Sequence, residues 1–197
     1  AAASALQSAQ NNATLKEISL GYKEITIQSI QHIQPFACET LDAAGSCALA
    51  NAHKRLLLEA RKVPLGTEKA RCYGLDMQPL SKIIISGQQG RVRIPDQDVP
   101  YIAAHTHPSG LTFSPSDIRR FALRENMRML TAVGNDGTVY AIEKTAPFDR
   151  SGLLALFHDS EIRLAAAKDP KELQEIMQQL LKEAKQYGAN FYAGRDR

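Results

Sequence analysis

The sequence predicts a mixed α/β (α+β) fold in which a mixed β-sheet is flanked by helices. Apolar residues recur at three- and four-residue spacing over residues 41–62 and again over residues 170–187, which is typical of amphipathic helices. Residues 129–133 and 138–143 have strand-like patterns on either side of the Asn135–Gly137 turn, a strong hairpin signal. Paired strands between helical segments therefore define the predicted fold class.

The N-terminal part of the chain contains one clear element. Residues 1–14 are rich in Ala, Ser, Gln and Asn, which predicts disorder or weak helicity. Residues 18–30 are compatible with either a short strand or a helix. A helix is predicted over residues 41–62, and the Pro64–Gly66 segment ends it because proline and glycine interrupt helices.

The rest of the chain alternates strand and turn signals before it becomes helical. Strands are predicted over residues 70–77, 81–86, 91–94 and 101–106. Helices are predicted over residues 116–130, 151–167 and 170–187, in addition to the helix over 41–62. The last of these is expected to be an amphipathic packing helix, with Gly188 in the position that follows a helix C-terminus.

The length of 197 residues allows one compact domain with extensions. We expect a partly disordered N-terminal extension over residues 1–40, a central domain over 41–145 and a C-terminal helical extension over 146–197. The chain does not begin with Met, which favours a fragment or a processed product. It also lacks a charged n-region followed by a long apolar stretch, so no signal peptide is expected.

The charge pattern argues against a nucleic-acid partner. The formal net charge is only +3, and no basic cluster with interleaved aromatic residues is present. Arg119, Arg120, Arg124 and Arg128 lie close together in the helix predicted over 116–130, but their spacing spreads them over a solvated face. No apolar run approaches the length that a membrane span requires, so no membrane partner is expected.

Cysteine usage favours a reducing compartment. Cys38, Cys47 and Cys72 form no Cys-x-x-Cys pair, and three cysteines necessarily leave one unpaired. We therefore expect the cytoplasm as the location.

The segment from His105 to Asp117 carries the strongest functional signal. His105 and His107 lie at the end of a predicted buried strand, where residues i and i+2 point to the same face. Pro108 ends that strand, and Asp117 follows at the start of the next predicted helix. Two imidazoles and one carboxylate that converge in this way are typical of a catalytic zinc site, in which a fourth position stays open for water.

The same segment resembles the motif of the JAMM (MPN-plus) zinc metallopeptidases. The residues that carry the resemblance are His105-x-His107-Pro108 and Ser114-x-x-Asp117, and the likeness extends over residues 40–145. It implies a cytidine-deaminase-like mixed sheet flanked by helices, so that residues 41–145 would form a JAMM-like domain. The amino-acid sequence of the motif looks most like that of the JAB-type domains found in phage and prophage proteins. This resemblance adds the phage particle as an implied location.

The resemblance also implies roles for individual residues. His105, His107 and Asp117 would bind zinc (Zn2+), and Ser114 would stabilise the oxyanion. The loop between His107 and Asp117 is one residue shorter than the family pattern, which leaves Ser116 as an alternative for the oxyanion. Ser114 keeps the Ser-x-x-Asp register, and Ser116 is then the predicted N-cap of the helix.

A general base completes the implied site. Family members use an upstream Glu, and Glu39, Glu59 and Glu68 are the candidates in this chain. Glu68 is favoured because it immediately precedes the strand predicted from Ala70, which is where the family places its base. Glu59 lies within a predicted helix and is more simply a solvated charge.

The implied function is that of a hydrolase, a zinc metallopeptidase that cuts an isopeptide or peptide bond in a protein or peptide. A ubiquitin-like conjugate is one such substrate. Glu68 would take the proton of a zinc-activated water and return it to the leaving amine. Two alternatives stay open: a non-catalytic JAMM-like scaffold, and a phage structural or assembly protein that carries this domain.

Overall fold

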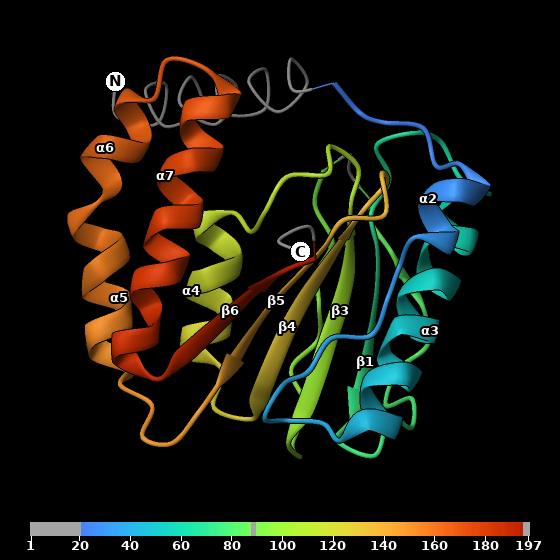
Figure 1. The fold of residues 1–197 in the computed structure, drawn as a ribbon, viewed down its shortest axis with the longest axis horizontal. Coiled ribbons are helices and arrows are strands. Elements are labelled where there is room, and N and C mark those ends of the chain that lie inside the picture. Colours follow the sequence, from blue (N-terminus) through green and yellow to red (C-terminus); the bar gives the residue numbers. More distant parts are fainter. Residues whose placement is uncertain (1–20, 88–89, 195–197) are drawn as a thin grey trace.

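A six-stranded mixed β-sheet with the order β2-β1-β3-β4-β5-β6 forms the centre of the protein (Figure 1). A computed structural model describes residues 21–87 and 90–194. The strands are β1 (Lys69–Gly74), β2 (Ile84–Ile85), β3 (Tyr101–His107), β4 (Met127–Gly134), β5 (Val139–Lys144) and β6 (Ala189–Ala193). The helices are α2 (Ile27–Gln31), α3 (Ala43–Ala60), α4 (Pro115–Leu123), α5 (Arg150–Asp159), α6 (Glu161–Ala166), α7 (Pro170–Glu183) and the 3-10 helix η1 (Ala184–Tyr187). The predicted class, a mixed sheet flanked by helices, is confirmed at this level.

The parallel pair in the sheet is β3 with β4, and the other neighbouring strands pair antiparallel. The chain leaves β3, passes through α4 and returns as β4, which is a βαβ crossover. The carboxyl end of β3 and the N-terminus of α4 therefore meet at one edge of the sheet. This is where ligand-binding crevices of α/β proteins form.

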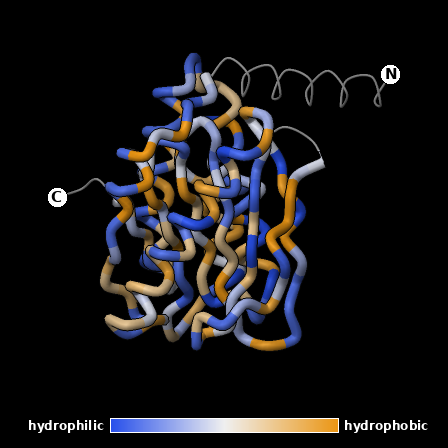
Figure 2. The backbone as a smooth tube through the Cα atoms, turned by 90° about the vertical axis from the view of Figure 1, so that its right-hand side faces the viewer, coloured by the Kyte–Doolittle hydropathy of each residue, from blue (hydrophilic) through white to orange (hydrophobic). Residues whose placement is uncertain are grey.

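Alternation along β3 sends neighbouring side chains to opposite faces of the sheet. Ile102 packs in the cluster beneath α3, whereas Tyr101 and Ala103 pack with residues of α4, α5 and α7. Figure 1 shows α2 and α3 on one side of the sheet and α4 to α7 on the other. Hydrophobic and hydrophilic residues are interleaved along the chain, as expected for elements with one buried side (Figure 2). His105 and His107 continue the register of Tyr101 and Ala103 and therefore face α4.

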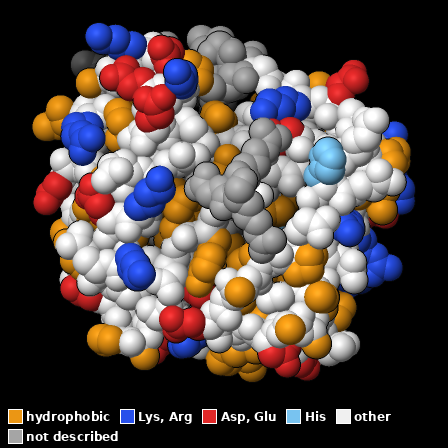
Figure 3. Space-filling view, in the orientation of Figure 1, with side chains coloured by type: hydrophobic (Ala, Val, Ile, Leu, Met, Phe, Trp, Pro, Cys, Tyr) orange, Lys and Arg blue, Asp and Glu red, His pale blue; other side chains and the backbone are white. Residues whose placement is uncertain are grey.

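The C-terminal segment covers the α4 side and adds a strand to the sheet. α7 buries Met177 and Leu180 and exposes Lys171 and Lys182, which confirms the predicted amphipathic packing helix. Lys and Arg side chains accordingly lie on the outer surface over α6 and α7 (Figure 3). Gly188 adopts the left-handed conformation, with φ 73°, after the helical segment as predicted. β6 then pairs antiparallel with β5, a strand that the sequence pattern did not predict. None of the helices described here has the length and apolar character to cross a membrane.

The helix predicted over residues 116–130 is too long by several residues. α4 ends at Leu123 because Arg124 adopts an extended conformation, and β4 begins at Met127. Met127, Met129 and Leu130 are fully buried in a strand that helices cover on both faces. Such strands read as continuous apolar runs without a period of two, and a run of this kind is easily taken for the end of a helix.

The strands predicted before β3 are shorter in the structure. β1 ends at Gly74, since Met77 lies in the following turn with φ 62°. β2 contains only Ile84–Ile85, within the strand predicted over 81–86, and it pairs antiparallel with β1. No strand forms over residues 91–94. Within residues 18–30, where the pattern left strand and helix open, the described part contains the start of α2, and the disorder expected over 1–14 lies outside the described residues.

Candidate metal centre

A capping interaction at the start of α4 fixes the position of Asp117. Ser114 is the N-cap, and its Oγ accepts a hydrogen bond from the Asp117 backbone N–H at 3.2 Å. Asp117 Oδ2 accepts in return from the Ser114 N–H at 2.9 Å and from its hydroxyl at 2.8 Å. Pro115 occupies the first helical position, where its missing N–H costs nothing. The prediction of Ser116 as N-cap is therefore wrong, because the reciprocal pairing needs a carboxylate three residues after the cap.

The three predicted ligands converge at the end of β3. The Nε2 atoms of His105 and His107 are 2.8 Å apart. Asp117 Oδ1 lies 3.7 Å from Nε2 of His105, and Oδ2 lies 3.5 Å from Nε2 of His107. One ligand atom from each residue can thus be chosen so that all lie within 4.8 Å of one another. His105 and Asp117 are buried, and the three side chains form a group that could hold a metal ion.

The hydrogen bonds of the two rings are compatible with that role. The carbonyl oxygen of Leu111 lies 2.9 Å from Nδ1 of His107, so this nitrogen carries a proton and donates it. Nε2 of His107 is then the nitrogen with a lone pair that a metal can use. Nδ1 of His105 is buried and has no hydrogen-bond partner among the described residues. Its Nε2 is the ring nitrogen that faces His107 and Asp117, which makes it the candidate ligand atom.

Electrostatic coupling within this group favours a bound cation. Burial lowers the pKa of His105. Burial also lowers the pKa of His107, but the bond to Asp117 and its charge outweigh this and raise the pKa to about 9. Burial raises the pKa of Asp117, yet the two histidines outweigh it and hold that pKa well below its usual range. The metal-free site therefore retains a proton between His107 and Asp117, which a metal ion would displace.

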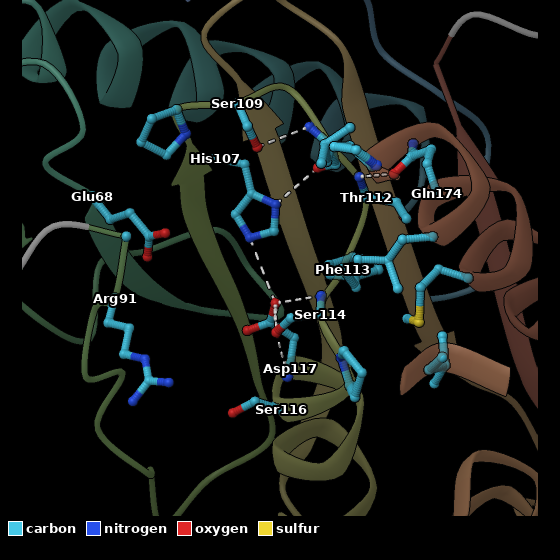
Figure 4. Close-up of a pocket in the computed structure, with 18 of the residues that line it drawn as sticks. Glu68, Arg91, His107, Ser109, Thr112, Phe113, Ser114, Ser116, Asp117 and Gln174 are labelled. Atoms are coloured by element: carbon cyan, nitrogen blue, oxygen red, sulfur yellow. Dashed lines mark hydrogen bonds and ion pairs between the residues drawn. The ribbon is translucent and has the colours of Figure 1, made fainter. Parts of the chain in front are cut away.

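α7 supports the loop that orients His107. Gln174 accepts a hydrogen bond at its Oε1 from the Thr112 N–H at 3.0 Å (Figure 4). Its Nε2 donates to the Tyr140 hydroxyl at 3.2 Å. Thr112 directly follows Leu111, whose carbonyl oxygen accepts the hydrogen bond from Nδ1 of His107. Gln174 therefore supports the site indirectly, because it holds the loop whose carbonyl orients His107. Sequence reasoning missed it, since its partners lie far away in the chain.

The arginines of the α4 region do not all lie on a solvated face, so that expectation was wrong. Arg120 Nη1 donates to Asp117 Oδ1 at 3.2 Å. Arg124 Nη2 donates to the Ile94 carbonyl at 2.8 Å, and Arg128 lies in β4 rather than in the helix. The three-residue spacing from Asp117 was the signal that could have identified Arg120, because such pairs are neighbours on a helix.

Of the three candidate bases, the structure brings Glu68 to the site. Glu68 directly precedes β1, is 7 % exposed and lines the same cavity as His107 and Asp117. Figure 4 shows its carboxylate directed toward the space beside His107, and its charge helps to raise the pKa of that histidine. Glu59, on α3, pairs instead with Lys62, which lies just beyond the end of that helix. Glu39 is exposed and lies near β6, where its carboxylate accepts from Asn190.

A cavity of about 1160 Å³ opens in front of the ligands. Glu68, His107 and Asp117 lie along it, together with residues 90–93, residues 108–109 and 111–114 of the loop after β3, and residues of the α6–α7 region. Pockets for small molecules are typically about 300–1,000 Å³, so this cavity is large enough for a longer ligand. The arrangement places a possible metal site and a separate carboxylate at one accessible surface.

No protein-family model, curated protein or solved structure matches this chain. The candidate site therefore rests on the geometry of its own residues. The likeness to the JAMM metallopeptidases stays a prediction from the sequence.

Proposed function

We propose that the protein is a zinc-dependent metallopeptidase of the JAMM type that hydrolyses an isopeptide or peptide bond. The observation that carries this proposal is the convergence of His105, His107 and Asp117 in front of a cavity that also contains Glu68. Structural zinc sites are closed by four protein ligands, whereas catalytic sites use three and leave a position for water. A group of two imidazoles and one carboxylate matches the second kind.

The residues around this group fit a zinc ion. The Leu111 carbonyl sets the proton on Nδ1 of His107, and Arg120 holds Asp117, which is the outer support that zinc ligands need. A bound zinc ion would lower the pKa of its water to roughly 7 and polarise a substrate carbonyl. The remaining chemistry belongs to side chains of the cavity.

Glu68 would act as the general base. It would accept the proton of the attacking water and return it to the leaving amine. Its position supports this role, because it lies in the same cavity as His107 but is not one of the three grouped ligands. A base must reach the water without occupying the position that the water needs.

Ser114 would donate a hydrogen bond to the oxyanion of the tetrahedral intermediate, a contact worth about 3 kcal/mol in barrier height. In the resting structure its hydroxyl donates to Asp117 Oδ2, so it would exchange this partner for the substrate oxygen. Ser116 is exposed and lies beyond Asp117 as seen from His107 in Figure 4, which makes it the weaker candidate.

Glu68→Gln tests the proposal because it removes the base and keeps the shape of the side chain. Hydrolysis of a peptide or a ubiquitin-like conjugate should be abolished, while zinc content stays at that of the unmodified chain. Glu59→Gln, on the exposed face of α3, is the matched control and should keep full activity. A zinc chelator should stop hydrolysis by the unmodified protein. Activity that survives Glu68→Gln would refute the role of this residue, and a zinc-loaded protein without chelator-sensitive hydrolysis would be a scaffold.

A further inference from the structure

One wall of the cavity is cationic. Burial alternates along residues 91–94, so that Val92 and Ile94 are buried while Arg91 and Arg93 are exposed and line the cavity. Within the part of the chain that the structure describes, neither guanidinium has a hydrogen-bond or ion-pair partner. The Gly90 N–H donates to the Gly66 carbonyl at 3.0 Å. This bond joins the segment that begins at Gly90 to the residues just before Glu68.

The opposite wall is apolar. Leu111, Leu164, Leu173 and Met177 line it from the loop after β3 and from the α6–α7 region. Figure 4 shows the two walls on either side of His107, with Arg91 on one side and Phe113 on the other. The metal ligands therefore lie between a charged wall and a hydrophobic wall.

Among the described residues, no ion pair joins an acidic side chain of the cavity to Arg91 or Arg93. Asp117 belongs to the metal group, and Glu68 faces the space beside His107. Asp169 caps α7 by accepting from the Glu172 N–H at 2.9 Å. Lys168 also lines the cavity, but it lies between α6 and α7, away from the arginine wall. A ligand with a negative charge beside Arg91 and Arg93 would therefore face groups of opposite charge.

Building on the proposed function, we infer that the substrate is a polypeptide with an acidic side chain on one side of the scissile bond and an apolar side chain on the other. The acidic side chain lies against Arg91 and Arg93, because guanidinium groups bind carboxylates in a two-pronged geometry. The apolar side chain packs against Leu173 and Met177, which removes hydrocarbon surface from water. A substrate with basic residues on the arginine side meets like charges and is disfavoured.

A scanning set of fluorogenic peptides tests this inference on the zinc-loaded full chain. The peptides share one sequence and carry Glu, Gln or Lys at each position in turn around an apolar residue. At the best position, kcat/KM should be roughly tenfold higher for Glu than for Lys, which corresponds to two partly exposed charge pairs. The difference should lie mainly in KM and should shrink at high salt, because salt screens exposed charges.

Two variants assign the preference to the two walls. The double variant Arg91→Glu/Arg93→Glu should reverse the order of Glu and Lys peptides. Arg119→Glu, an exposed charge on α4 outside the cavity, should leave the order unchanged. Leu173→Asn should weaken the preference for an apolar residue on the other side.

The outcomes separate this inference from the proposed function. Chelator-sensitive cleavage without a charge preference overturns the inference and leaves the metallopeptidase standing, and so does a preference that the arginine double variant does not alter. Binding of the same labelled peptides to Glu68→Gln, followed by fluorescence anisotropy, reads the preference without catalysis. Equal binding of Glu and Lys peptides there contradicts the inference, and a lack of any cleavage by the unmodified chain contradicts the proposed function.

Discussion

Two buried carboxylates, Glu143 and Asp117, have different surroundings in this protein. Glu143 is fully buried in β5, and four donors that carry no charge fill its two oxygens. They are the backbone N–H of Glu39 at 2.9 Å, the N–H of Thr40 at 2.8 Å, and the hydroxyls of Thr40 and Tyr192. This carboxylate ties the segment before α3 and the last strand to the sheet.

Asp117 is also buried, but each of its oxygens also faces the imidazole of a histidine. Ser114 supplies both bonds to Oδ2, and Arg120 donates to Oδ1, which lies 3.7 Å from His105. A buried charge is costly in either place and must be compensated. The comparison shows that burial of a charge does not by itself indicate a functional site. What distinguishes Asp117 is that other ligand atoms converge on it.

Asp117→Asn should have the largest effect on the metal site. The substitution keeps the size of the side chain but removes the negative charge that holds a cation. Loss of an outer support residue costs about 10–100-fold in zinc affinity, and loss of a ligand charge should exceed 100-fold. Competition with a fluorescent zinc chelator measures this affinity. An unchanged affinity would mean that Asp117 resembles Glu143 and serves the fold alone.

Glu143→Gln should show the opposite pattern. The amide nitrogen would face donors in place of one accepting oxygen, and we expect the free energy of unfolding to fall by about 3 kcal/mol. Urea denaturation of the metal-free chain measures this change. Zinc affinity of the folded variant should match that of the unmodified protein. A variant that folds normally but binds zinc poorly would overturn the distinction between the two carboxylates.

Zinc affinity should increase with pH. His107 must lose its proton to bind a metal, and its pKa in the metal-free protein is raised to about 9. Below this value each unit of pH should change the apparent affinity about tenfold, with higher affinity at higher pH and a plateau above pH 9. Titrations at several pH values would show the slope. A flat profile between pH 7 and 9 would contradict a proton held between His107 and Asp117.

Gln174→Ala should have the smallest of these effects. It removes the support of the loop that presents the Leu111 carbonyl to His107, so zinc affinity should fall by about tenfold. Gln179→Ala, on the same helix but exposed, is the matched control. If both variants bind zinc equally, α7 does not support the metal site.

The local parts of this molecule could be predicted from the sequence. The Asn135–Gly137 turn specifies the β4–β5 hairpin, and the two-residue spacing of His105 and His107 places both on one face of β3. The reciprocal cap between Ser114 and Asp117 could have been predicted in the same way, because a cap and its partner are three residues apart, although Ser116 was predicted as the cap.

The parts that depend on contacts between distant segments could not be predicted. Glu143 is bonded to residues more than a hundred positions earlier and to Tyr192, and no local pattern marks these partners. The same holds for the contact between Gln174 and Thr112, which links α7 to the metal group. β6 was missed because a short strand gains its stability from pairing with β5 rather than from its own sequence.

The central claim is that His105, His107 and Asp117 form a zinc site, and the zinc content of the purified chain tests it most directly. The unmodified protein should bind about one zinc ion per chain, as three converging ligands imply, and His105→Ala/His107→Ala should bind almost none by elemental analysis. His32→Ala/His158→Ala changes two exposed histidines and should keep the metal. Stoichiometric zinc in the His105→Ala/His107→Ala variant would contradict the account.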